Sequence, residues 1–206
     1  MSKHSQSIDN NTLNRIYGHR GGWVFTPAHF LDLGSRDAIA TALKRHKRAG
    51  IIRQLARGLY DYPIDHPVLG RVAPSADAIA RALSRRDATR LQPTGAYAAN
   101  VLGLSEQVPT RIEFLTDGPS RRVKLGRREI ILKHTTPRNM ATAGRRSGTV
   151  IQALRWLSQQ HIDDKVVSIL RRQLSPADRT QLLKDVQFAP GWIADILRRL
   201  ATKKPQ

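Results

Sequence analysis

The chain has 206 residues and carries 35 Lys and Arg against 16 Asp and Glu, a formal charge of +19 at pH 7. A chain of this length holds one large domain or two small ones, and its charge favours a nucleic acid, an acidic protein or an anionic surface as partner. No apolar run is long enough to cross a membrane, the N-terminus lacks the apolar core of a secretory signal, and the absence of cysteine excludes disulfides and thiolate metal sites. We therefore expect a soluble, cytoplasmic protein.

Residues 8–17 have the apolar spacing of a first helix, which Gly18, Gly21 and Gly22 end. Residues 23–25 have the composition of a short strand, and we expect it to lie beside a hairpin. Because the glycines precede the strand and open no helix, they do not form a dinucleotide-binding loop.

The next segment, residues 26–62, is predicted to form a short helix, a tight turn, a basic helix and a β-hairpin. Thr26 and Pro27 are typical of a helix start, since a threonine hydroxyl caps free amides and proline suits the first helical position. Ser35 then caps the second helix, which runs to Gly50.

The second helix separates into two faces at the helical angle. Its predicted core face consists of Ala38, Ile39, Ala42, Leu43, His46 and Ala49. Strands at 51–55 and 59–62, joined by a corner with Gly58 free to take positive φ, form the hairpin. This order of elements is typical of a winged helix-turn-helix domain, with the second helix in the major groove and the hairpin as the wing.

The face opposite the core is predicted to contact DNA. The candidate base readers, at the leading end of the helix, are Arg36, Ala40, Thr41 and Lys44. The candidate phosphate or wing contacts are Arg45, Lys47, Arg48, Arg53 and Arg57. Any surface helix of a protein this basic also carries cations, but the order and spacing of the elements favour DNA binding.

A proline-bracketed stretch, residues 62–67, predicts a domain boundary, because proline disfavours helix continuation on both sides. We therefore expect a winged helix-turn-helix domain at residues 1–66 and a second domain at residues 67–206. The second domain holds +14 of the net charge of +19, so basicity is not confined to the predicted DNA-reading part.

The second domain is predicted to be of mixed α/β type, with a small antiparallel sheet and terminal helices, which makes the whole chain α+β. Two helices are expected first, one capped by Ser75 and one over 94–102. The predicted strands are 111–116, 121–125 and 129–134, and four helices follow, starting near Ser147 or Thr149, Asp163 or Asp164, Ser175 and Pro190.

The predicted strands of this domain carry a second group of cations: Arg121, Arg122, Lys124, Arg127, Arg128 and Lys133. They form a phosphate-contacting or partner-docking surface, or they are ordinary charged positions that discourage edge pairing. The residue pattern leaves both interpretations open.

No local signature of catalysis is present. The chain has no phosphate-binding P-loop, no GxSxG elbow, no HExxH and no histidine cluster at metal-ligand spacing. We therefore expect no enzyme, no metal and no cofactor, although dispersed catalytic residues leave no local pattern.

The run from Val24 to Tyr62, with TPAHFLDLGSR and IIRQLARGLYDYP, resembles the N-terminal winged helix of AbiEi-type antitoxins, and its most specific piece is RGLY at Arg57 to Tyr60. The rest of the chain resembles that family only in outline. The resemblance implies an antitoxin encoded beside a nucleotidyltransferase toxin. Such proteins repress their own operon by binding promoter repeats, and the C-terminal domain is associated with counteracting the toxin. Family members differ in whether the antitoxin contacts the toxin.

Two other functions stay open. An RNA-binding or tRNA-shielding module would use the strands from Arg121 to Lys133. A purely protein-binding neutraliser would form a stable complex with an acidic partner and bind duplex DNA weakly at physiological salt.

Overall fold

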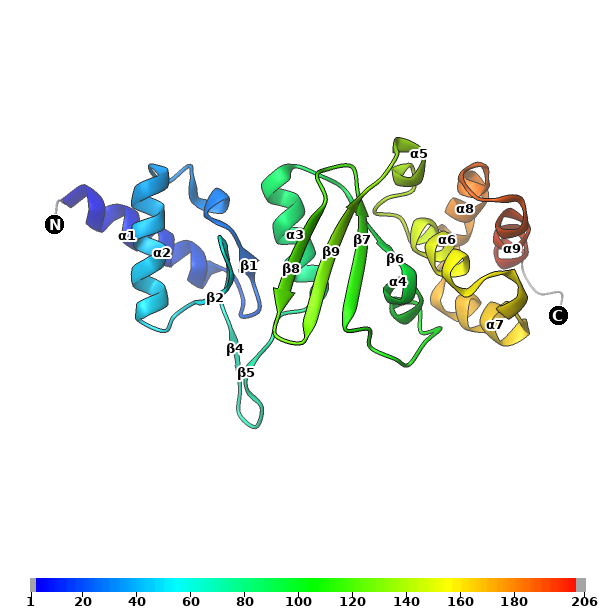
Figure 1. Ribbon diagram of the computed structural model, residues 1–206, viewed down its shortest axis with the longest axis horizontal. Coiled ribbons are helices and arrows are strands. Elements are labelled where there is room, and N and C mark those ends of the chain that lie inside the picture. Colours follow the sequence, from blue (N-terminus) through cyan, green and yellow to red (C-terminus); the bar gives the residue numbers. More distant parts are fainter. Residues whose placement is uncertain (1–2, 203–206) are drawn as a thin grey trace. The chain divides into compact units, whose positions relative to one another are not determined.

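The structure is a computed structural model that describes residues 3–202, with side chains for residues 7–84 and 88–202. The chain forms two compact units, Met1–Ala88 (unit 1) and Thr89–Gln206 (unit 2). Both combine helices with small sheets, so the predicted α+β class is confirmed (Figure 1). The division lies later than the predicted boundary after residue 66, because helix α3 (Ala76–Asp87) packs on strand β1 of unit 1.

Unit 1 begins with a long helix and continues with short strands around a second helix. Its elements before α3 are α1 (Lys3–Gly18), β1 (Val24–Phe25), the 3₁₀ helix η1 (Pro27–Phe30), α2 (Arg36–Arg48), β2 (Arg53–Ala56), β3 (Leu59–Asp61), β4 (Ile64–His66) and β5 (Gly70–Val72). Strands β1, β3 and β2 form an antiparallel sheet in that order, so the strand predicted beside the hairpin is confirmed. The predicted short helix after Thr26 is a single 3₁₀ turn.

The core of unit 1 fixes the orientation of α2. Its fully or almost fully buried members are Ile16, Phe25, Phe30, Ile39, Leu43 and Ile52. They come from α1, β1, η1 and α2 and from the segment before β2, and α1 lies beside α2 (Figure 1). Burying these aliphatic and aromatic side chains removes apolar surface from water, which holds one face of α2 inward and leaves the other exposed.

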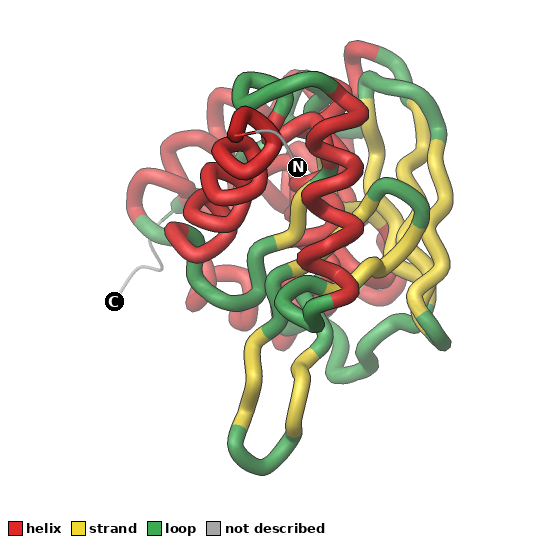
Figure 2. Tube along the Cα trace, turned by 90° about the vertical axis from the view of Figure 1, so that its left-hand side faces the viewer, coloured by secondary structure: helices red, strands yellow, loops and turns green. Residues whose placement is uncertain are grey.

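The segment predicted as a connector forms a second hairpin instead. Strands β4 and β5 pair antiparallel, with Ile64 opposite Val72 and His66 opposite Gly70. Pro63 precedes β4 and Pro67 lies in the loop, so neither position needs a backbone amide for the ladder. Figure 2 shows this hairpin extending away from the other elements of unit 1.

Unit 2 consists of a four-stranded sheet and a group of helices. Its elements are β6 (Leu91–Thr94), α4 (Gly95–Val101), β7 (Arg111–Thr116), β8 (Arg121–Leu125), β9 (Arg128–His134), α5 (Pro137–Met140), α6 (Arg146–Leu157), η2 (Gln159–His161), α7 (Asp164–Gln173), α8 (Pro176–Asp185), η3 (Val186–Phe188) and α9 (Gly191–Ala201). The strand order is β6-β7-β9-β8.

The sheet of unit 2 is mixed, so the predicted antiparallel sheet was wrong. Strand β9 lies between β7 and β8 and pairs in parallel with β7. Residues 130–132 of β9 are all buried, as in a central strand, whereas β8 carries the cations that suit a sheet edge. Strand β6, with Pro93 inside it, was not predicted and forms the other edge.

Helices α4, α6, α7, α8 and α9 enclose the main core of unit 2, and in Figure 1 they lie at the β6 end of the sheet. Gln92 and Thr94 of β6 hydrogen-bond to Thr149 and Gln152 of α6, which joins sheet and helices. Two predicted helix starts are confirmed by caps at Asp163 and Ser175. Among the described residues, no helix has both the length and the apolar character needed to cross a membrane.

Candidate nucleic-acid interface

Helix α2 presents one buried and one charged face, as predicted. Ser35 Oγ accepts a hydrogen bond of 3.3 Å from the Ala38 backbone amide and caps the helix. Ile39, Ala42, Leu43 and His46 are buried, so most of the predicted inward face is confirmed. Ala38 is only half-buried, and Ala49 follows the helix and is exposed.

The leading end of α2 meets the turn of the β2–β3 hairpin around one open hollow. It has a volume of about 510 Å³, and its lining includes Arg36, Ala40, Arg57 and Gly58. Gly58 has φ of 70°, which only glycine adopts easily, so this turn brings Arg57 back toward α2. Two predicted base readers and one predicted wing residue therefore share a single concave surface.

Four predicted DNA contacts are exposed cations without an acidic partner among the described side chains. They are Arg36, Lys44, Arg48 and Arg57. Lys47 is also exposed and donates a 2.8 Å hydrogen bond to the neutral Gln54 side chain. Cations that are not neutralised within the protein are available for phosphate or base edges.

Two other predicted contacts lie on the side of α2 that faces α1. Arg45 is half-buried, with its guanidinium 3.5 Å from the Asp9 carboxylate of α1. Thr41 lines a second hollow together with Ile8 and Asp9. Both residues are therefore placed away from the hollow that contains Arg36 and Arg57.

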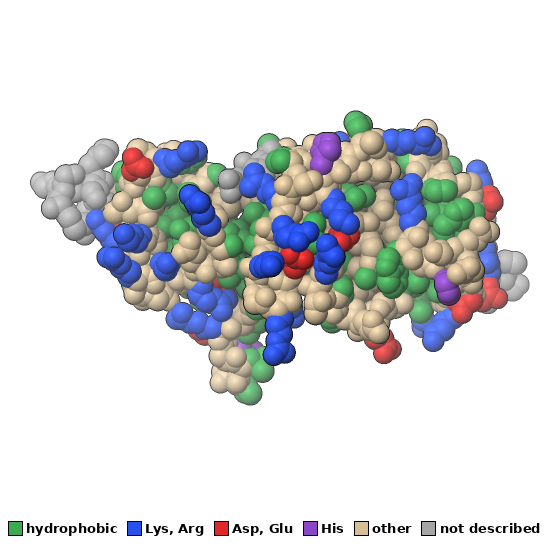
Figure 3. Space-filling view, viewed as in Figure 1, with side chains coloured by type: hydrophobic (Ala, Val, Ile, Leu, Met, Phe, Trp, Pro, Cys, Tyr) green, Lys and Arg blue, Asp and Glu red, His purple; other side chains and the backbone are tan. Residues whose placement is uncertain are grey.

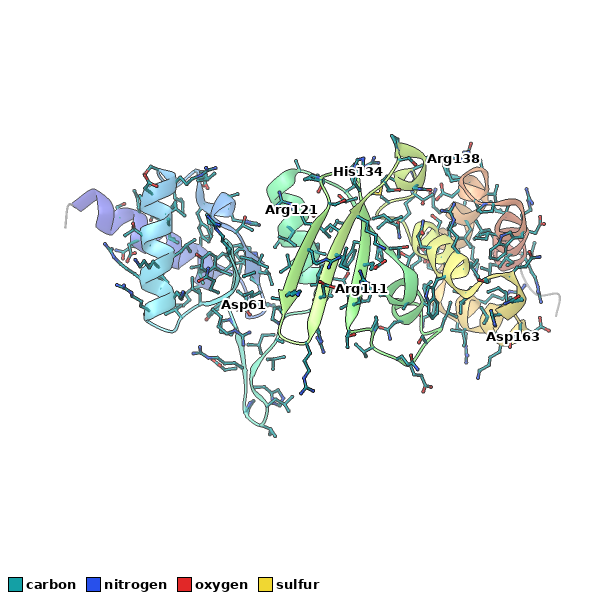
Figure 4. All side chains as sticks on the ribbon, in the orientation of Figure 1. Asp61, Arg111, Arg121, His134, Arg138 and Asp163 are labelled. Atoms are coloured by element: carbon teal, nitrogen blue, oxygen red, sulfur yellow. The ribbon has the colours of Figure 1, made fainter. Side chains whose placement is uncertain are left out.

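Arg53 has a structural role in the unit. It donates two hydrogen bonds, of 3.1 and 2.6 Å, to the completely buried carboxylate of Asp61, directly across the β2–β3 pair. The hydrogen bond to Asp61 raises the pKa of Arg53 above its ordinary value. In Figure 4, Asp61 lies near the base of the β4–β5 hairpin.

The β4–β5 hairpin, missed by sequence reasoning, adds a cation next to α2. Arg71 donates a 3.0 Å hydrogen bond to the Gly50 carbonyl, just past the C-terminal end of α2. This contact satisfies a carbonyl at the negative end of the helix dipole. The apolar Ile64 followed by polar Asp65 and His66, with a glycine at position 70, is compatible with a hairpin. The prolines at positions 63 and 67 favoured a connector instead, which is why the hairpin was not predicted.

The second group of cations is divided between the two faces of the unit 2 sheet. By strand alternation, Arg122, Lys124 and Lys133 share one face, whereas Arg121 and Arg128 belong to the other. Figure 4 labels Arg121 on β8 and Arg111 on β7. Arg127 lies in the turn between β8 and β9.

On the first of these faces, Arg122 and Lys133 are paired with glutamates, as is Arg111 of β7. Arg122 lies 3.4 Å from Glu129, Lys133 lies 2.7 Å from Glu113, and Arg111 lies 3.4 and 3.8 Å from the two glutamates. Figure 3 shows blue and red side chains interleaved over this sheet. The pairing lowers the local excess of positive charge, so this face is a weaker polyanion surface than its sequence indicates.

No group of three or more His, Asp or Glu side chains within the described residues is arranged to hold a metal ion. The hollow beside α2 contains no pair of titratable groups with opposed charge that would indicate acid–base chemistry. Its exposed arginines and open shape suit the binding of an anionic surface.

A family model matches residues 11–182, which include most of unit 1 and much of unit 2. The chain belongs to the DUF6088 family. This is a family of unknown function, so membership extends across both units and assigns no activity. No curated protein matches the chain.

One solved structure similar to this DUF6088 chain is that of the Rv2827c protein from Mycobacterium tuberculosis. It has 18% sequence identity to the chain and a TM-score of 0.43, over 100% of this chain and 73% of the other. A likeness of this size supports no inference about function.

Proposed function

We propose that the chain is a DNA-binding transcriptional regulator in which unit 1 is a winged helix-turn-helix domain. Helix α2 is the recognition helix, and the β2–β3 hairpin is the wing. The observation that carries this proposal is the hollow in which Arg36 and Ala40 of α2 meet Arg57 of the hairpin turn. Exposed cations at the leading end of a helix, beside a hairpin turn, suit major-groove entry with a wing on the adjacent backbone.

The contacts divide by position on α2. Arg36 and Ala40, with Lys44 one turn further, are the proposed base readers, because they lie at or near the hollow at the start of the helix. Lys47, Arg48 and Arg57 are the proposed phosphate contacts. Arg53 and Arg45 are not assigned to DNA, since their guanidinium groups face Asp61 and Asp9.

The wider proposal rests on the resemblance of residues 24–62 to AbiEi-type antitoxins. On that basis the chain is an antitoxin that represses its own operon by binding repeats in promoter DNA, and it counteracts a nucleotidyltransferase toxin encoded beside it. Direct contact with the toxin is not part of the proposal. The division of the cations of unit 2 between two sheet faces gives an RNA-binding surface there less support.

Substituting Arg36 and Lys47 tests the DNA-binding proposal. Gel-shift titrations would use duplexes tiled across the DNA directly upstream of the coding sequence, with a scrambled duplex for comparison. We expect Arg36→Ala to weaken binding to the preferred duplex about tenfold or more and to reduce the preference over the scrambled duplex. Lys47→Ala should weaken binding to both duplexes equally. It should also reduce the slope of the logarithm of the binding constant against the logarithm of the salt concentration by about 1.

The matched control is Arg138→Ala, at an exposed arginine of unit 2, which should bind like the parent. If Arg36→Ala and Lys47→Ala also bind like the parent, the assignment of α2 as the recognition helix is wrong. If the parent chain binds none of the duplexes, the regulator proposal itself fails.

A further inference from the structure

The β4–β5 hairpin is exposed along its length and ends in an apolar tip. Its strands pair only with each other, and every residue from Ile64 to Arg71 is exposed. Val68 and Leu69 are 85% and 73% exposed, the highest values among the large hydrophobic side chains that the structure describes. Isolated two-stranded hairpins are marginally stable in water, so both its support and its exposed tip need an explanation.

The hairpin is anchored to the C-terminal end of α2. Arg71 donates to the Gly50 carbonyl, and Arg53 donates to the carbonyls of Arg71 and Val72 at 3.3 and 2.7 Å while it binds Asp61. Because Asp61 is completely buried, this cluster ties the base of the hairpin to the sheet of unit 1. The direction of the hairpin is therefore fixed relative to α2.

The tip is held in shape by a histidine. His66 Nδ1 accepts hydrogen bonds of 3.2 Å from the backbone amides of both Val68 and Leu69. Gly70, with φ of 65°, then returns the chain into β5. These bonds close the turn and leave the two aliphatic side chains pointing away from it, so little conformational freedom is lost when the tip binds.

We propose that the β4–β5 hairpin is a second DNA-contacting arm, whose Val68–Leu69 tip enters the minor groove next to the major groove occupied by α2. This inference rests on the proposed function. Helix α2 has 13 residues and spans about 20 Å, with the β2–β3 turn beside its start and the β4–β5 hairpin beside its end. Apolar side chains inserted from the minor groove partly unstack a base step and bend the duplex toward the major groove.

The charges at the base of the hairpin fit this partner. Lys47 and Arg48 are exposed near the end of α2 and suit phosphates that border the groove. The exposed acid of the hairpin, Asp65, is paired with Arg71 at 3.3 Å. A second copy of the chain is a poorer occupant, because two aliphatic side chains fall far short of the about 800 Å² that each partner buries in a stable interface.

The double variant Val68→Ser/Leu69→Ser tests the arm. Bending and affinity would be measured by energy transfer between dyes at the two ends of the duplex that the parent prefers among those tiled upstream of the coding sequence. We expect the parent to bend this duplex, and the double variant to lose the bend and about tenfold in affinity. The control Val108→Ser removes another exposed apolar side chain, 65% exposed, from unit 2 and should behave like the parent.

Each outcome decides the inference. If the double variant bends the duplex like the parent while Arg36→Ala loses sequence preference, the arm is refuted and the proposed function stands. If sedimentation shows a dimeric parent and a monomeric double variant, the tip is a contact between copies and the arm is also refuted. If the parent binds no duplex, the arm fails together with the proposed function. Thermal melting of the double variant checks that unit 1 remains folded.

Discussion

Arg53 and Arg57 lie four residues apart in one hairpin, and the structure surrounds them differently. Arg53 binds the completely buried carboxylate of Asp61, with 27% of its own side chain exposed. Arg57 lines the hollow beside α2 and has no acidic partner among the described side chains. Arg53 therefore stabilises the fold through its ion pair, whereas Arg57 is available for a ligand.

Replacing each arginine by methionine separates these roles. Arg53→Met should lower the free energy of unfolding by about 3 kcal/mol, because it leaves the Asp61 carboxylate buried without its partner. Arg57→Met should leave the free energy of unfolding nearly unchanged and weaken duplex binding. Urea unfolding and gel-shift titration of both variants measure this. If the two variants have equal free energies of unfolding, burial of the Asp61 carboxylate does not require Arg53.

At the scale of elements, helix starts and faces could be predicted well because they depend on neighbouring residues. The caps at Ser35, Asp163 and Ser175 and the inward face of α2 follow from local hydrogen bonding and helical spacing. The hairpin was predicted to follow the helix directly, but no sequence pattern predicted the hollow that joins Arg36 to Arg57.

Strand pairing could not be predicted to the same extent, because it depends on contacts between distant residues. The parallel pairing of β7 with β9 leaves no local spacing signal, and β6 contains Pro93, which argues against a strand. The division of Arg121 and Arg122 between two sheet faces follows from the register alone. The role of Arg53 was missed because burial of Asp61, eight residues later, is a tertiary property.

The pairing of β6 with β7 is supported by an ion pair with a defined pH dependence. Asp117, just after β7, accepts two 2.8 Å hydrogen bonds from Arg90, just before β6, one from the backbone amide and one from Nε. The side-chain hydrogen bond from Arg90 is the main reason that the pKa of Asp117 is lowered. A carboxyl whose pKa is lower in the folded state stabilises the fold above its unfolded pKa of about 3.9, and this stability is lost as the pH falls through the folded pKa.

Asp117→Asn should therefore lower the melting temperature by about 2–4 °C between about pH 5 and pH 8, and the difference from the parent should disappear in acid. Thermal melting across this pH range measures it. Asp195→Asn, at an ion pair whose carboxylate is 76% exposed, is the control and should change melting little at any pH. A difference for Asp117→Asn that persists in strong acid would contradict a charge-dependent contribution.

At the scale of the whole molecule, the charge is spread over both units. Unit 1 carries 14 Lys and Arg against 7 acids, and unit 2 carries 21 against 9, so the net charges are +7 and +12. The DUF6088 match likewise includes parts of both units. The proposed DNA contacts all lie in unit 1, so the larger charge of unit 2 is available for a different partner.

If unit 1 reads DNA and unit 2 meets a different partner, as in the proposed function, DNA reading and toxin relief can be uncoupled. Arg36 is exposed and lies in unit 1, so Arg36→Ala should neither unfold the chain nor alter unit 2. When the neighbouring reading frame is expressed, we expect it to arrest growth, and both the parent and Arg36→Ala to relieve the arrest. A reporter fused to the upstream DNA should be repressed by the parent and about tenfold less by Arg36→Ala.

If the neighbour is harmless, or if the parent does not relieve the arrest, the antitoxin proposal fails. If Arg36→Ala loses relief and repression together, the two roles share unit 1.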